Sequence, residues 1–209
     1  MSGELLLAFW GVSLLLVMTP GMDWAYVISA GIRGRGVVPA VGGLLCGHLL
    51  ATLLVVAGAG VLVSRYPLTL TGLTLAGAGY LLWLGVSMVR QSLLLSTSLP
   101  IQTTALGNHS WLHWLVHGTC VSGMNPKVFL LFLALLPQFT DPQGDWSLPE
   151  QMLTLGGLHL VSCGIVYLAV GYGAKQLLRS RPQASRWLMR GSGIAMVVIG
   201  SGLLIEPWM

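Results

Sequence analysis

Charge is what this sequence has least of. Only 8% of its 209 residues are Asp, Glu, Lys or Arg, whereas soluble domains average about 25%. So few charges do not cover the surface of a 22.2 kDa globule, which excludes an ordinary soluble enzyme. A disordered chain is excluded too, because 55% of the residues are hydrophobic. Bilayer crossings take about 20 residues each, so the composition predicts an integral membrane protein embedded in lipid.

Cysteine is also scarce, and its odd count of 3 excludes a complete disulfide framework. Cys46, Cys120 and Cys163 all fall in apolar runs, so we interpret them as packing residues. The sequence contains neither a phosphate-binding loop nor a nucleophile–base set. We therefore expect a protein that is not an enzyme, has no cofactor, and draws on a gradient rather than on ATP.

Long apolar runs predict an all-α integral membrane fold. Continuous runs, without alternation, are typical of helices rather than of barrel strands. The predicted spans lie near residues 4–30, 37–63, 67–89, 111–137, 151–174 and 187–206. The polar stretch 96–110 is predicted to link two three-helix units, residues 1–95 and 111–209, within one structural domain.

Basic residues gather on one predicted side of the membrane. Eight of the ten lie in the connections after the first, third and fifth spans: Arg33, Arg35, Arg90, Lys175, Arg179, Arg181, Arg186 and Arg190. This bias places the linker in the cytoplasm and both termini on the outer (periplasmic) side of the membrane. The net charge of +4 then indicates a rim facing anionic lipid headgroups, and no nucleic-acid partner.

Three features recur in the same order in the two halves. They are the pairs Pro20 and Pro126, His48 and His159, and the Gly-x-Gly segments that begin at Gly77 and Gly191. Their offsets are similar, at 106, 111 and 114 residues. With three spans per half, the second half enters the membrane from the opposite side. The sequence thus predicts two inverted repeats, the arrangement of secondary transporters, whose substrate site lies between the halves.

Matching helix breaks predict where that site lies. Thr19-Pro20-Gly21 interrupts the first span and Asn125-Pro126 the fourth, and proline removes one helical hydrogen bond. A charge of opposite sign, Asp23 or Lys127, stands beside each break. Intramembrane charges mark binding sites or proton relays, so we expect Asp23 to bind an ammonium group or a proton and Lys127 to attract a carboxylate. Two structural alternatives stay open: an ion pair joining the repeats, or Asp23 as a helix cap.

Histidines suggest two further roles. His48 lies in an apolar span, where it either relays protons near the site or is a hydrogen-bonded structural residue. His109, His113 and His117 recur every four residues, a spacing that suits zinc ligands but also an aromatic anchor at the membrane interface. This row keeps a divalent-metal exporter as the alternative function.

The chain resembles the lysine-exporter (LysE/RhtB) family of amino-acid export carriers. The resemblance rests on Met18-Thr-Pro-Gly-Met-Asp23, Gly47-His48, Asn125-Pro126-Lys127, Leu136-Pro137-Gln138-Phe139 and Asp141-Pro142. It implies six spans in two inverted halves and export of amino acids or their derivatives, coupled to proton entry. The family usually has Pro-Gly-Pro before Asn or Asp, so the single proline here is expected to give a milder first break.

Together these features predict a proton-coupled exporter of small amino acids, or of their derivatives, that works by alternating access. We expect its first and fourth helices to be broken at proline and its site to surround Asp23 and Lys127. A membrane enzyme or scaffold is disfavoured, because neither needs paired broken helices. The sequence leaves open whether the carrier is a homodimer.

Overall fold

The computed structural model describes residues 2–34, 36–65 and 110–174, together with separate positions between 72 and 93 and between 190 and 204. Within these residues the chain is helical apart from connecting turns and loops, and no strand occurs. The side chains of residues 59–65, 126, 127 and 130 lie outside this description. The all-α fold predicted from the continuous apolar runs is therefore confirmed for the described part.

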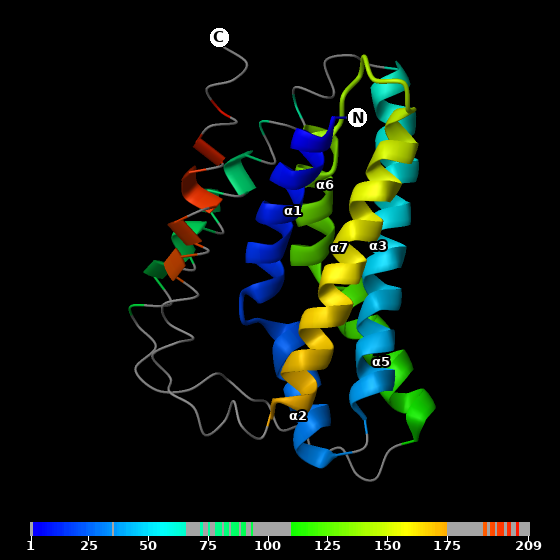
Figure 1. The fold of residues 1–209 in the computed structure, drawn as a ribbon, viewed down its shortest axis with the longest axis vertical. Helices are drawn as coiled ribbons and strands as arrows, with labels where there is room; N and C mark the ends of the chain where they lie inside the picture. The colour runs from blue at the N-terminus through cyan, green and yellow to red at the C-terminus, as the bar shows by residue number, and fades with distance from the viewer. Residues whose placement is uncertain are drawn as a thin grey trace.

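Two long helices, α3 (Val37–Arg65) and α7 (Leu148–Tyr172), run side by side through the molecule (Figure 1). Both are long and apolar enough to cross a bilayer, and the bent pair formed by α1 and α2 adds a third candidate span. These helices confirm an integral membrane protein. The predicted spans 67–89 and 187–206 fall largely outside the described residues, so the count of six remains a prediction.

The first span is broken, as predicted, at Pro20. Helix α1 (Gly3–Met18) ends before it, α2 (Met22–Arg33) begins after it, and the two axes differ by 55°. The carbonyl groups freed at the break find partners within the protein. Leu16 O accepts from the Thr19 N–H at 3.1 Å, and Val17 O accepts from the Trp24 indole at 2.9 Å. Since these carbonyls are satisfied internally, the bend is stable in an apolar environment.

The fourth predicted span is broken in the same way. Helix α5 (Trp111–Gly123) ends before Asn125, and α6 (Pro126–Leu135) begins at the proline. In Figure 1, α1 and α6 occupy the upper half of the view, whereas α2 and α5 lie in the lower half. The two broken helices thus cross the molecule in opposite directions. A short 3₁₀ turn, η1 (Pro137–Phe139), leads from α6 toward α7.

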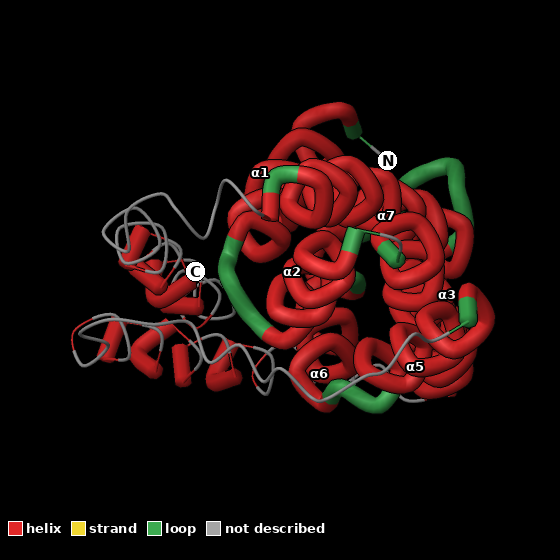
Figure 2. Tube along the Cα trace, turned by 90° about the horizontal axis from the view of Figure 1, so that it is seen from below, coloured by secondary structure: helices red, strands yellow, loops and turns green. Residues whose placement is uncertain are grey.

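Glycines let α3 approach α5 closely, and Figure 2 shows α3 beside both α5 and α7. A side chain at Gly47 would come within 2.6 Å of the Gly123 nitrogen, and one at Gly43 would collide with Leu115 O. Gly43 and Gly47 have the four-residue spacing of small residues that is typical of close helix packing in membranes.

Two large apolar clusters form most of the core of the described residues. The first joins α2, the beginning of α3, α5 and the end of α7, and includes Ile28, Leu44 and Val170. The second joins α1, the later part of α3, α6 and the beginning of α7, and includes Phe9 and Leu155. The polar side chains described next lie where these two clusters meet.

Candidate functional site

A cavity of about 60 Å³ opens between the two helix breaks. Its apolar lining comes from both core clusters, with Val17 from the first and Phe132 from the second. Its polar lining consists of Thr19, Asp23, His48, Asn125, His159 and Tyr167. Buried polar groups in an otherwise apolar helical bundle are expensive and mark a functional site by default.

The Asp23 carboxylate is the acidic group of this cavity, on the second residue of α2 and only 8% exposed. Its Oδ2 atom accepts a 3.0 Å hydrogen bond from the Tyr167 hydroxyl. Its Oδ1 atom is buried without a hydrogen-bond partner in the described part of the chain. A buried carboxylate oxygen is stable only when a donor or a proton satisfies it. The geometry therefore suits a cationic donor that enters the cavity.

The His48 ring lies beside this carboxylate, with Nε2 at 3.7 Å from Asp23 Oδ2. Its Nδ1 atom lies 2.9 Å from the Leu44 carbonyl and 2.6 Å from the Ser122 hydroxyl. A carbonyl oxygen only accepts, so we assign the ring hydrogen to Nδ1. In the neutral ring Nε2 then directs a lone pair toward the carboxylate, and a proton added there turns repulsion into an ion pair. His48 and Asp23 together can hold one proton.

The second repeated histidine, His159, lies next to His48, with the ring centroids 5.4 Å apart. Its Nδ1 atom is hydrogen-bonded to the Ser13 hydroxyl at 2.7 Å, and its Nε2 atom lies 3.3 Å from Cys163 Sγ. The edge of its ring packs against Phe132 with centroids 4.9 Å apart. Residues paired by the sequence repeat thus meet at one place.

The structure brings most of the predicted site residues together. Those that line the same cavity are Thr19, Gly21, Asp23, His48 and Asn125. Pro20 is buried at the first break, and Pro126 begins α6. Lys127 is the second residue of α6, but its side chain lies outside the described residues, so its pairing with Asp23 remains a prediction.

The predicted histidine row lies elsewhere, on α5. The rings of His113 and His117 stack with centroids 5.8 Å apart, and Tyr26 stacks on His117 at 5.4 Å. Neither histidine lines the cavity described above. His109 lies outside the described residues, so the row as a set of three metal ligands remains untested.

Sequence reasoning missed the neighbours that orient the site, above all Tyr167 and Ser122. One signal was present: His159, Cys163 and Tyr167 recur every four residues on an apolar helix, which places them about 40° apart on one face. Our interpretation of Cys163 as packing was incomplete, because it lies in the core but also contacts His159. Ser13 on α1 and Ser122 on α5, which are hydrogen-bonded to the two histidines, follow no comparable pattern in the sequence.

Comparison with known proteins gives a family and no solved structure. The model of the LysE type translocator family matches residues 14–207. A homoserine/homoserine lactone efflux protein of Salmonella typhimurium is 32% identical over 205 residues, which cover 96% of each chain. A lysine exporter LysE of Corynebacterium diphtheriae is 22% identical over 228 residues, with 93% of this chain and 96% of that one covered. No solved structure matches the chain.

A third relative, an uncharacterized membrane protein of Vibrio cholerae, is 29% identical over 202 residues and covers 95% of each chain. The family match spans both helix breaks and every residue that lines the cavity. The family match confirms the prediction that the protein is a transporter and not an enzyme. The chain belongs to the LysE family of translocators.

Proposed function

We propose that the protein exports small amino acids or their derivatives across the inner membrane, coupled to proton entry, by alternating access. The observation that carries this proposal is the buried residue Asp23, which lines a cavity formed at both helix breaks and whose Oδ1 atom has no partner among the described residues. The family membership supports efflux of amino-acid-type substrates rather than of metal ions.

The names of the relatives suggest which substrate group matters most. Homoserine and homoserine lactone share a primary ammonium group, but the lactone has no free carboxylate. A carrier for both therefore needs an acid for the ammonium, and Asp23 is the acidic residue of the cavity. The carboxylate of an amino acid would meet the amide of Asn125, the first turn of α6, and Lys127. A helix N-terminus favours an anion there.

A proton and a substrate ammonium would compete for the same carboxylate. In the proposed cycle, the substrate leaves when a proton from the outside reaches Asp23, and His48 Nε2, 3.7 Å away, shares that proton. The empty carrier then returns with the proton and releases it to the cytoplasm. This exchange makes export depend on the proton gradient.

The positions of the two core clusters support alternating access. Each cluster supplies apolar residues to one part of the cavity lining, so opening either one would expose the site to one side of the membrane. A cavity of about 60 Å³ holds a few water molecules, so binding of an amino acid would need the two clusters to move apart. The moving bodies would be the proposed inverted repeats 1–95 and 111–209, joined by the cytoplasmic linker 96–110.

The test is efflux of labelled homoserine from proteoliposomes with an imposed pH gradient. Asp23→Asn keeps the shape but removes the charge, and losing one partner of a buried charge pair costs about 2–5 kcal/mol. The expected efflux rate is lower by at least about 30-fold. Asp145→Asn, in the loop before α7, is the matched control and should transport normally. Efflux that survives in Asp23→Asn would refute the proposed role of this carboxylate.

A second variant tests the coupling. His48→Gln retains a polar side chain but removes the group that shares the proton. We expect downhill homoserine exchange to persist while uphill export driven by the pH gradient is lost. Equal uphill export in the variant and the unmodified protein would remove His48 from the proton step.

A further inference from the structure

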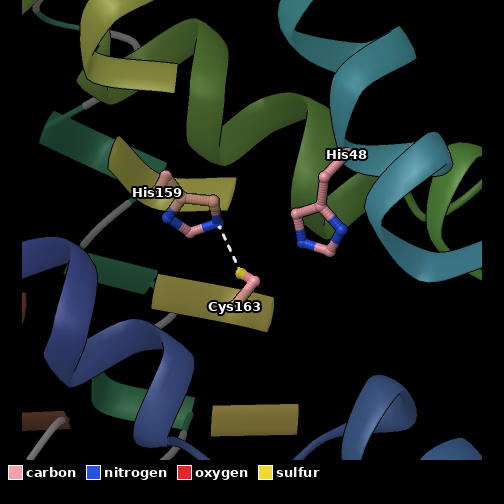
Figure 3. A group of neighbouring side chains, drawn as sticks. All are labelled: His48, His159 and Cys163. Atoms are coloured by element: carbon pink, nitrogen blue, oxygen red, sulfur yellow. Dashed lines mark hydrogen bonds between the residues drawn. The ribbon is translucent and has the colours of Figure 1, made fainter. Parts of the chain in front are cut away.

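Three metal-binding side chains gather beside the cavity, and the proposed transport cycle uses only one of them. His48 comes from α3, and His159 and Cys163 come from successive turns of α7 (Figure 3). All three are buried, and Cys163 is 0% exposed. One ligand atom from each, the imidazole nitrogen or the thiol sulfur, lies within 4.8 Å of the other two.

These distances are close to those of a zinc site. With Zn–S near 2.3 Å and Zn–N near 2.0 Å, neighbouring ligand atoms of a tetrahedral site are about 3.5 Å apart. The Cys163 Sγ and His159 Nε2 atoms are already 3.3 Å apart. A shift of about 1 Å would bring the His48 ligand nitrogen to the same separation from the other two ligand atoms. Side chains move over such a distance by thermal motion.

Hydrogen bonds to the outer nitrogens hold both rings in a suitable orientation. Ser13 bonds Nδ1 of His159, and the Leu44 carbonyl and Ser122 bond Nδ1 of His48. Zinc-binding histidines nearly always have such a partner on the nitrogen that does not bind the metal. Both Nε2 atoms therefore remain for an ion placed between the helices.

Charge balance adds a fourth group. Asp23 Oδ2 lies 3.7 Å from His48 Nε2, at the side of the site that opens to the cavity. A divalent ion bound by a Cys163 thiolate, two neutral imidazoles and the Asp23 carboxylate carries no net charge. Neutrality matters here, because an uncompensated charge inside an apolar bundle costs several kcal/mol.

We propose that His48, His159 and Cys163 form an inhibitory site for a borderline-soft divalent ion of the Zn²⁺ class. Thiolate and imidazole ligands select such ions over Mg²⁺ and Ca²⁺, which prefer oxygen. Binding releases the Cys163 thiol proton to solvent and forms one metal–sulfur bond. The bound ion ties α3 to α7, helices of opposite proposed repeats, and occupies Asp23, so export stops.

Ion binding is measured first, and it does not depend on the proposed function. Purified protein in detergent is titrated with Cd²⁺, whose bond to a thiolate gives an ultraviolet charge-transfer band, and with Zn²⁺ in competition. We expect one ion per chain and a thiolate band. Cys163→Ser and Cys163→Ala should abolish the band and weaken binding at least about 10-fold, as the loss of a metal-site contact does. Cys120→Ser, which alters an exposed cysteine, should bind like the unmodified protein.

Inhibition is measured second and rests on the proposed function. Zn²⁺ should block homoserine efflux from proteoliposomes containing the unmodified protein or Cys120→Ser, whereas Cys163→Ser, normalised to its own efflux, should resist it. Unchanged binding in both Cys163 variants, a missing thiolate band, or equal Zn²⁺ inhibition in Cys163→Ser would overturn the site. If homoserine is not transported at all, the proposed function fails while the Cd²⁺ titration still decides the site.

Discussion

The hydroxyl of Tyr167 donates a 3.0 Å hydrogen bond to the Asp23 carboxylate and thereby links α7 to α2 across the site. The bond uses Oδ2, the same oxygen that faces His48. Oδ1 is buried and has no hydrogen-bond partner in the described part of the protein. Tyr167 thus fixes the orientation of the Asp23 carboxylate, and under the proposed function it is a positioning residue for the substrate ammonium.

Replacing Tyr167 by Phe removes this bond and leaves the carboxylate free to rotate. Hydrogen bonds to charged groups contribute about 1.5–3 kcal/mol, so we expect a roughly 10- to 100-fold higher KM for homoserine, with a smaller change in the maximal rate. Tyr172→Phe, at an exposed position of the same helix, is the matched control. Initial-rate efflux assays separate the two parameters, and an unchanged KM in Tyr167→Phe would contradict the positioning role.

The indole of Trp24 stabilises the first helix break, because it donates to the Val17 carbonyl at 2.9 Å. Trp24→Phe keeps an aromatic ring but leaves that carbonyl unpaired, at a cost of about 1–2 kcal/mol in a membrane bundle. The thermal unfolding midpoint in detergent should therefore fall by several degrees. Trp83→Phe, at an exposed position, should leave the midpoint unchanged. Equal midpoints for the two variants would mean that the break does not depend on the indole.

The helix breaks were predictable because proline acts locally. Pro20 and Pro126 each remove a helical hydrogen bond, so the sequence alone indicated both interruptions, and the repeat indicated that they would meet. The partners of the freed carbonyls were not predictable in this way. At the first break Trp24 and Thr19 bond freed carbonyls internally. That outcome depends on the 55° bend, which no residue pattern specifies.

The neighbours of Asp23 depend on how separate helices rotate and cross. Tyr167 is 144 positions from Asp23, and Ser122 is 74 positions from His48. Neither contact follows from spacing along the chain. The start of α7 has a local signal that the predicted span did not use. Ser147-Leu-Pro-Glu150 is a capping box, and Glu150 accepts from the Ser147 N–H at 2.8 Å, so α7 begins at Leu148 rather than at the predicted residue 151.

Close packing of α3 on α5 gives a third prediction. A methyl group at Gly47 would lie 2.6 Å from the Gly123 nitrogen and 2.7 Å from Ser122 Cβ, so Gly47→Ala forces the helices apart. Overpacking of this kind costs about 1–3 kcal/mol, and the shift would also disturb the bond between Ser122 and His48. Gly157→Ala, where a methyl group meets nothing within 4 Å, should be neutral or slightly stabilising. Thermal unfolding of both variants checks this, and an unaltered midpoint in Gly47→Ala would contradict it.

The loop between η1 and α7 depends on one amide side chain. Gln151 is fully buried. Its Nε2 donates to the carbonyls of Asp141 and Trp146, at 2.9 and 2.8 Å, and its Oε1 accepts from the Asp141 N–H at 2.8 Å.

Gln151→Leu removes all three bonds at similar size. Because each unpaired group costs about 1–3 kcal/mol, the amide of Asp141 should exchange hydrogen at least about 10-fold faster. Gln143→Leu, at an exposed position of the same loop, should leave exchange unchanged. Hydrogen exchange followed by mass spectrometry over residues 140–147 makes the comparison. Equal exchange in both variants would show that the loop is held by its own backbone, since the amide would then contribute nothing measurable.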